Sequence, residues 1–488
     1  MELLEVQTHR LLKEWLRHCA PASWPHALTL GRWTALALRL EKTLLVQTGT
    51  LPQRYSSAYL LPLLLWSEPW QLVVTPERQR QVQEQDIPAL QDWLQGRGED
   101  YAAKVIAELN ILTPRQWFET QASLPTLIEQ ADYVEDWARE YGSYRLQEKD
   151  WQEWQQASPA LAETIRNAKI KLTKAFFSRP VNPYNDYLLT AEEQQILESL
   201  LHPLSQDPGV SPVFTQFWQA WQTQPDNYLL WAQLERDRGQ FCLQLSPIDV
   251  KAFLAPYWRS PLILLGGFLD LQKEATLYRQ NLGLGELLCL KFTPNRQTES
   301  IQVYLPDGLP LPNTPEFKGV LFLQIQRLIQ ASLSLPLTIV ILIDDLPLKF
   351  PLATQLAAEF GTRVKVEQTQ LKEGSILISS WSFWCQYQSQ LPTPHLLILG
   401  TLPLPSLEHP LVASRVNYCK RHRQDWFRHY LLPTALKALQ QSVIPLRENQ
   451  GAIAIFDARV NSRSYSPQIL GALEPYAKSN YIDPLWFC

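Results

Sequence analysis

Short apolar runs alternate with longer amphipathic stretches in the first part of the chain. The apolar runs lie at residues 44–46, 71–74, 110–112 and 124–128, and the stretches at 27–40 and 77–94 have helical periodicity. Strands that alternate with helices are typical of a parallel sheet. In such sheets ligands bind at the carboxyl ends of the strands. The Thr, Gly and acidic residues that follow these runs are therefore the first candidates for a site.

The pattern changes between residues 133 and 244, where Trp, Gln, Glu and Leu recur at helical spacing. We interpret this region as a helical insertion. Its two i, i+3 tryptophan pairs, Trp151/Trp154 and Trp218/Trp221, favour packing between helices over stacking on nucleic-acid bases.

Strand-like runs return at 260–265 and continue at 337–343, 363–367, 375–379, 395–399 and 451–456, with helical stretches at 351–360 and 425–441. The pattern predicts an α/β protein with two parallel-sheet lobes and a helical insertion in the first lobe. The expected divisions are 1–132 for the first lobe, 133–244 for the insertion, 245–285 for the return to the first lobe, and 286–488 for the second lobe.

Composition narrows the class of protein. The 488 residues are 45% hydrophobic and 19% charged, which is typical of a folded globular protein. A formal net charge of −4 means that any nucleic-acid site must be a local basic patch. The six cysteines form no C-x-x-C pair and the eight histidines show no ligand spacing, so we predict no metal site. No apolar run reaches the ~18–20 residues that cross a bilayer, so we expect a cytoplasmic protein without a membrane partner.

The turn after the first strand has the frame of a phosphate-binding loop. Residues 44–62 read LLVQTGTLPQRYSSAYLLP, in which strand, tight turn and helix follow one another as in G-x-x-x-x-G-K-[ST]. The candidate nucleotide-binding residues are Gly49, Thr50, Arg54 and Ser56. The motif's lysine is absent, and either Arg54 or Tyr55 takes its place, depending on the register. Pro52 has no N–H to offer a phosphate.

The order of the motifs resembles that of the DinG/XPD family of superfamily 2 DNA helicases. The segments that carry this resemblance are 44–62, 73–90, 128–132, 305–317, 376–384, 401–410 and 451–476. The resemblance covers nearly the whole chain. It implies two P-loop (RecA-like) lobes, ATP and Mg²⁺ as possible cofactors, and DNA as a partner.

Several catalytic positions of that family are changed here. The resemblance implies that Glu129 is the carboxylate that helps to hold Mg²⁺ and that Gln130 stands where the family has its general base. A neutral amide cannot accept the proton, and such catalysis is typically worth ~10²–10⁴-fold. Arg447 is the one plausible arginine of the final motif. No cysteine lies between Cys19 and Cys242, so we expect no iron–sulfur cluster.

A basic cluster lies in the second lobe and is interleaved with Tyr418, Trp426 and Phe427; it comprises Arg415, Lys420, Arg421, Arg423 and Arg428. Neutralisation of phosphates together with aromatic stacking is how proteins hold single strands without reading sequence. We therefore predict binding of single-stranded DNA, or of RNA. The alternative is a solvated helix face whose charge Asp425 balances.

Three functional hypotheses follow. The first is a helicase-related protein that binds single-stranded nucleic acid, with weak or absent ATP and Mg²⁺ binding and with motor activity lost. The second is an active ATP-dependent DNA helicase with divergent motifs. The third is an interaction scaffold with a protein partner. Whether the chain is an enzyme stays open at this point.

Overall fold

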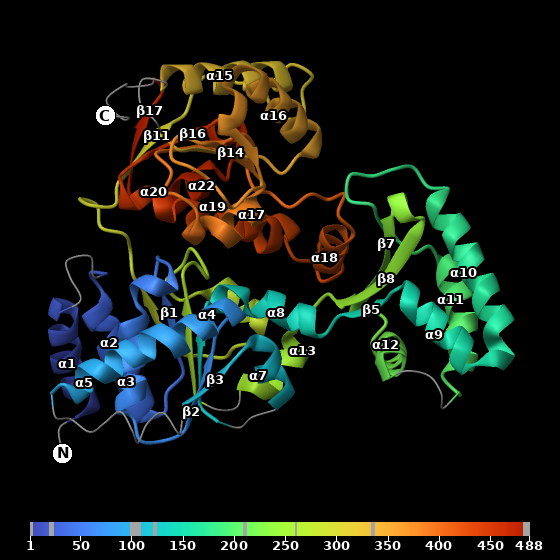
Figure 1. The fold of residues 1–488 in the computed structure, drawn as a ribbon, viewed down its shortest axis with the longest axis horizontal. Helices are drawn as coiled ribbons and strands as arrows, with labels where there is room; N and C mark the ends of the chain where they lie inside the picture. Colours follow the sequence, from blue (N-terminus) through green and yellow to red (C-terminus); the bar gives the residue numbers. More distant parts are fainter. Residues whose placement is uncertain are drawn as a thin grey trace.

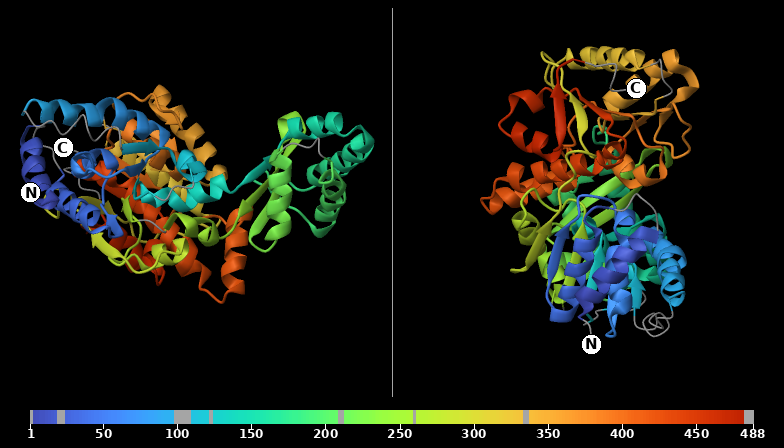
Figure 2. Two further views of the ribbon diagram at one scale, coloured as in Figure 1. Left: turned by 90° about the horizontal axis from the view of Figure 1, so that it is seen from below. Right: turned by 90° about the vertical axis from the view of Figure 1, so that its left-hand side faces the viewer.

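The computed structural model describes residues 3–18, 24–97, 109–120, 124–207, 212–258, 261–332 and 337–481. Figure 1 shows two α/β lobes, one above the other, and an insertion that projects to one side. In Figure 2 the left view shows the insertion projecting from the lobes, and the right view shows the two lobes one above the other. None of the helices in the described ranges has the length and hydropathy that crossing a membrane requires.

The first lobe is built on a six-stranded parallel sheet. Its order is β10-β1-β9-β4-β2-β3, and the strands are β1 (Leu44–Gln47), β2 (Trp70–Val73), β3 (Leu109–Leu112), β4 (Thr126–Glu129), β9 (Leu262–Gly266) and β10 (Leu288–Lys291). The apolar runs seen in the sequence form the strands, as predicted. Strand β10 pairs with β1 in the register Leu44↔Leu288, so this sheet extends beyond residue 285, where we expected the second lobe to begin.

Helices cover both faces of the first sheet, which explains why β1, β2, β4 and β9 are buried at every position. Leu44 and Val46 belong to the core on one face and Leu45 to the core on the other. The first face packs against α1 (Leu4–His18), α2 (Ala27–Leu40), α3 (Ser56–Leu65) and α5 (Ile87–Gln95). The second packs against α7 (Pro114–Thr120), α8 (Val134–Tyr141), α13 (Lys251–Leu254) and α14 (Thr276–Leu282).

The insertion is not purely helical, which corrects our prediction. Its helices α9 (Glu148–Ala157), α10 (Ala162–Phe177), α11 (Ala191–Leu204) and α12 (Pro212–Thr223) pack on an antiparallel sheet β5-β8-β7-β6. These strands are β5 (Tyr144–Leu146), β6 (Asp186–Leu188), β7 (Tyr228–Glu235) and β8 (Gln240–Pro247). The β7–β8 hairpin turns at Gly239, whose φ of 63° suits a glycine. Trp151 and Trp154 are 0% and 1% exposed, and both lie in the core of the insertion.

The second lobe has a seven-stranded parallel sheet in the order β13-β14-β12-β15-β16-β11-β17. The strands are β11 (Ile301–Tyr304), β12 (Ile339–Leu342), β13 (Val364–Val366), β14 (Ile376–Ser379), β15 (Leu396–Leu399), β16 (Ala452–Ile455) and β17 (Tyr476–Ser479). On one face lie α15 (Phe317–Ala331) and α16 (Leu346–Phe360). On the other lie α17 (Trp381–Tyr387), α19 (Leu432–Ser442), α20 (Ile444–Glu448) and α22 (Ser466–Ala472). The architecture of two RecA-like lobes is confirmed.

Candidate functional sites

Several backbone N–H groups of the loop between β1 and α3 already donate hydrogen bonds to other parts of the protein backbone. Gly49 has a φ of 67°, and the chain then enters a short 3₁₀ turn at Pro52–Arg54. Four of the loop's N–H groups donate to backbone carbonyl oxygens: Thr48 to Gly266 (2.7 Å), Gly49 to Gly267 (3.0 Å), Arg54 to Leu51 (3.1 Å) and Tyr55 to Pro52 (3.1 Å). A phosphate-binding loop directs such groups at its ligand instead. In this loop they stabilise the protein itself.

Tyr55 stands directly before α3, which begins at Ser56. Its side chain is 1% exposed, and its ring lies 5.8 Å from that of Trp24 and 6.1 Å from that of Tyr59. Arg54 is directed to another partner, because its Nη1 lies 3.3 Å from Oε1 of Glu299. In both registers left open by the sequence, the residue that replaces the lysine has partners within the protein.

Glu129, at the end of β4, is the centre of a buried polar cluster. Its Oε1 accepts a 2.6 Å hydrogen bond from the Tyr59 hydroxyl, and its Oε2 accepts a 3.0 Å bond from Nε of Arg78. Arg78, in helix α4 (Pro76–Gln81), also pairs with Asp86 at 2.7 Å. Burial raises the pKa of Glu129, and the charge of Arg78 opposes this shift. Sequence reasoning missed Tyr59 and Arg78, although both lie in segments that carry the family resemblance.

The residues after Glu129 tie two strand ends together. Gln130 adopts a left-handed conformation with φ of 59°. The Asp132 carboxylate accepts hydrogen bonds from the amides of Gly267 and Phe268, both at 2.7 Å. The fit is close, since a Cβ on Gly266 would lie 2.8 Å from Oδ2 of Asp132. This clamp fixes the chain after β4 against the chain after β9.

The space between the lobes beside this loop is a cavity of about 80 Å³. Small-molecule sites usually measure about 300–1,000 Å³. Asp132 is the one charged residue among those that line it, all of which are described; the others include Thr50, Tyr55, Gln130, Tyr133, Cys385, Gln388 and Gln441. The lining residues therefore do not fit a magnesium–triphosphate complex, because no cation faces the phosphates and Asp132 is engaged by two amides.

Arg447 does not line this cavity. Its Nη1 donates to the carbonyl oxygens of Glu299 and Pro475, and its Nη2 to those of Leu473 and Glu474. Burial lowers its pKa to about 10. These contacts fasten the segment before β17 to the linker between the lobes.

The predicted basic cluster is divided between an interface and the surface. Arg415, in α18 (Pro410–Arg421), forms an ion pair with Glu135 and lies 4.1 Å from the ring centroid of Tyr430. Arg421 and Arg428 have side chains that are 54% and 70% exposed. Lys420 and Arg423 are also exposed, and Lys420 lies 5.7 Å from the ring centroid of Trp426.

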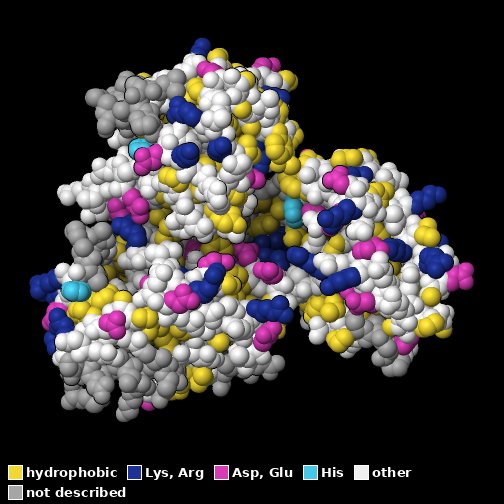
Figure 3. All heavy atoms as spheres, in the orientation of Figure 1, with side chains coloured by type: hydrophobic (Ala, Val, Ile, Leu, Met, Phe, Trp, Pro, Cys, Tyr) yellow, Lys and Arg dark blue, Asp and Glu magenta, His cyan; other side chains and the backbone are white. Residues whose placement is uncertain are grey.

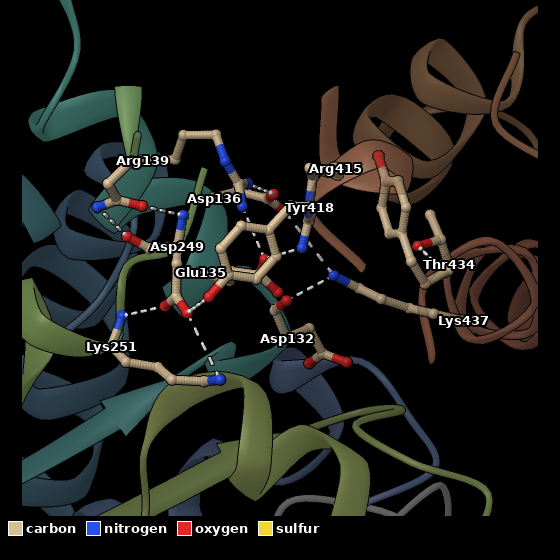
Figure 4. A network of polar contacts seen from close by, with 12 residues as sticks. Asp132, Glu135, Asp136, Arg139, Asp249, Lys251, Arg415, Tyr418, Thr434 and Lys437 are labelled. Atoms are coloured by element: carbon tan, nitrogen blue, oxygen red, sulfur yellow. Dashed lines mark hydrogen bonds and ion pairs between the residues drawn. The ribbon is translucent and has the colours of Figure 1, made fainter. Parts of the chain in front are cut away.

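A polar network joins α8 of the first lobe to the second lobe (Figure 4). Burial alone would raise the pKa of Glu135, but Arg415 and Arg139 lower it to about 2. The Tyr418 hydroxyl donates to Asp249 at 2.9 Å, and Nζ of Lys437 donates to the Asp132 carbonyl oxygen. Of the cations in this network, sequence reasoning found Arg415 but not Arg139 or Lys437, and it did not find Glu135, which pairs with Arg415.

A larger cavity of about 690 Å³ lies between the lobes beside this network. Its walls come from α8, from residues 268–281, and from residues 409–440 of the second lobe. Lys and Arg side chains gather on this side of the molecule where the two lobes and the insertion meet (Figure 3). The described residues contain no group of three or more side chains suited to holding a metal ion.

Comparisons with known proteins place a family match in the second lobe. Residues 353–476 match the helicase C-terminal domain family. The ATP-dependent DNA helicase YoaA of Escherichia coli (strain K12) is 30% identical over 111 residues, which cover 22% of this chain and 18% of YoaA. YoaA of Haemophilus influenzae is 27% identical over 128 residues, which cover 26% of this chain and 20% of that protein. The matches thus span about a fifth of these relatives.

Solved structures share the fold over most of the chain. Xpd4 of S. tokodaii superposes with a TM-score of 0.59 at 12% identity, covering 93% of this chain and 100% of that one. An apo XPD structure gives a TM-score of 0.57 at 12% identity, with coverage of 92% and 100%. The family match in the second lobe and the helicase relatives make this chain similar to DinG/XPD-type superfamily 2 helicases, and the solved structures share its two-lobe fold.

Proposed function

We propose that this protein is a DinG-like, helicase-related protein that binds single-stranded nucleic acid and has lost most or all of its ATP-driven motor activity. The observation that best supports the loss of motor activity is that Glu129 is buried and hydrogen-bonded within the first lobe. Both oxygens of this carboxylate are engaged, by Tyr59 and by Arg78, and its side chain is fully buried.

The other hydrolysis positions support the same conclusion. Gln130 cannot act as a general base, and Tyr55 fills the start of α3 where a phosphate-binding lysine is needed. Arg447 donates to four carbonyl oxygens away from the cavity. A phosphoryl-stabilising arginine is typically worth ~10³–10⁵ in rate, so these losses together leave little catalytic power.

Binding of a single strand is supported by the exposed part of the basic cluster. Lys420, Arg421, Arg423 and Arg428 are all solvent-accessible, and Trp426 beside them is partly exposed. Cations beside an aromatic ring can neutralise phosphates and stack on bases whatever the sequence. Single-stranded DNA is the proposed ligand, with RNA of equal length as the comparison.

The deciding experiment measures ATP turnover and strand binding on the same preparation. We expect phosphate release at the level of the buffer blank, with and without a 30-nucleotide oligo-dT. We also expect fluorescence anisotropy to report binding of labelled oligo-dT that weakens steeply with added salt. DNA-stimulated turnover would overturn the loss of motor activity, and binding that is absent at low salt would overturn the nucleic-acid function.

A further inference from the structure

Helix α18 of the second lobe is fastened to the insertion. Leu411 and Tyr418 of this helix pack against the apolar cluster of Leu229, Trp231 and Ile248. Tyr418 also donates its hydroxyl to Asp249. Figure 1 shows α18 between the upper lobe and the insertion sheet. The second lobe is thus joined to the rest of the molecule by more than the linker between the lobes.

The same helix is fastened to the first lobe through charge. Arg415 pairs with Glu135, which also accepts a 2.7 Å bond from Arg139. The side chains of Arg415 and Glu135 are 20% and 23% exposed, so water and salt screen this pair less than a pair on the open surface. We use the word latch for Glu135, Arg415, Tyr418 and Asp249.

The latch borders the 690 Å³ cavity. Glu135, Arg139 and Arg415 all line it, as do Asp136 and Lys437. Figure 4 shows that the acids of α8 point toward the cations of α18 and α19. A polyanion entering the cavity would therefore meet cations that already have carboxylate partners, and it would have to replace those partners.

We propose that Glu135 is an autoinhibitory acid: it occupies Arg415, keeps α18 latched, and competes with the phosphates of a single strand for this arginine. The proposal rests on the nucleic-acid function proposed above. Exchange of one anionic partner for another keeps the guanidinium paired throughout, so the latch can open without leaving a buried charge alone. Strand binding and release of the second lobe are then one event.

The test compares Glu135→Gln with Glu140→Gln, on the same helix. Both changes are nearly isosteric and remove one negative charge, but Glu140 is exposed and does not line the cavity. Hydrogen exchange of the amides in α18 and β7 reports the latch, and anisotropy with a 20-nucleotide oligo-dT reports binding. For Glu135→Gln we expect about tenfold faster exchange in α18 and about tenfold tighter binding. For Glu140→Gln we expect changes of less than about threefold in both, because an exposed charge contributes little.

A third variant separates the two readouts. Arg415→Gln should speed exchange in α18 as Glu135→Gln does, without the gain in affinity, because the cation for which the strand and Glu135 compete is gone. If Glu135→Gln leaves exchange and affinity at wild-type values, the latch is overturned. If no variant binds oligo-dT at low salt while exchange in α18 still quickens, the nucleic-acid function and the strand competition fail and the latch itself stands.

Discussion

The hydroxyl of Tyr59 donates a 2.6 Å hydrogen bond to the carboxylate of Glu129, joining α3 to the end of β4. Both side chains are 0% exposed, and neither lines the cavity between the lobes. A carboxylate in the position of the family's acidic motif is here part of the core of the first lobe. The first prediction concerns Arg78, the cation that pairs with Glu129.

Arg78→Met should destabilise the first lobe strongly. The substitution leaves Glu129 buried without its cation, and breaking a buried pair in this way costs about 3–5 kcal/mol. Urea unfolding followed by tryptophan fluorescence measures the loss. Arg80→Met, at an exposed position of the same helix, is the matched control and should stay within about 0.5 kcal/mol of wild type. Equal midpoints for the two variants would contradict a structural role for the Arg78–Glu129 pair.

Gln130→Glu should fail to restore ATP hydrolysis. The variant supplies a carboxylate in the family's general-base position, but Tyr55 and the engaged Glu129 remain as they are. Phosphate release with oligo-dT is the measurement, and an active DNA helicase assayed alongside is the positive control. A gain of ~10²–10⁴-fold in the rate of phosphate release would mean that the missing base alone limits hydrolysis. The inference that the loop between β1 and α3 cannot hold a triphosphate would then be wrong.

Reversal of the exposed basic cluster should weaken strand binding. In Lys420→Glu/Arg421→Glu/Arg423→Glu, we expect at least tenfold lower affinity for oligo-dT and a salt dependence that is shallower by about one unit per lost phosphate contact. The control is the reversal of three exposed cations on α10 of the insertion, Arg166, Lys171 and Lys174, which changes the net charge equally. Similar losses in both triple variants would indicate a general charge effect and no defined site.

Asp186 should make stability depend on pH. It is 7% exposed, its Oδ2 lies 3.6 Å from Nε2 of His409, and burial raises its pKa to about 6. The folded state therefore holds a proton that the unfolded state has released between pH ~4 and 6, so the contribution of Asp186 to stability is most favourable below pH ~4 and falls as pH rises through 6.

Asp186→Asn removes this titration. Above pH 6 the variant should gain up to about 3 kcal/mol over wild type, the equivalent of about two pKa units. Thermal unfolding between pH 4.5 and 8 measures the difference, with Asp237→Asn at an exposed position of the insertion as the control. A constant difference across this range would show that the pKa of Asp186 is not raised.

The strands of both lobes could be predicted where their sequence is apolar on both faces. Leu44–Gln47 and Ile339–Leu342 are buried throughout, and such runs stand out without any alignment. The insertion hairpin was missed because Tyr228–Glu235 is rich in residues that also form helices and has no strict alternation of buried and exposed positions. Strand β10 was missed because Leu288–Lys291 lies at a sheet edge and is only partly buried.

The chain's sequence by itself determined the two parallel-sheet lobes, the order of the helicase motifs and the loss of the P-loop lysine, because local periodicity and residue identity carry that information. Only the tertiary structure decided what the charged residues do. Glu129 pairs with a tyrosine 70 positions away, and Arg415 with a glutamate 280 positions away. The energy of an ion pair depends on distance and burial in space, and neither is written in the spacing of residues along the chain.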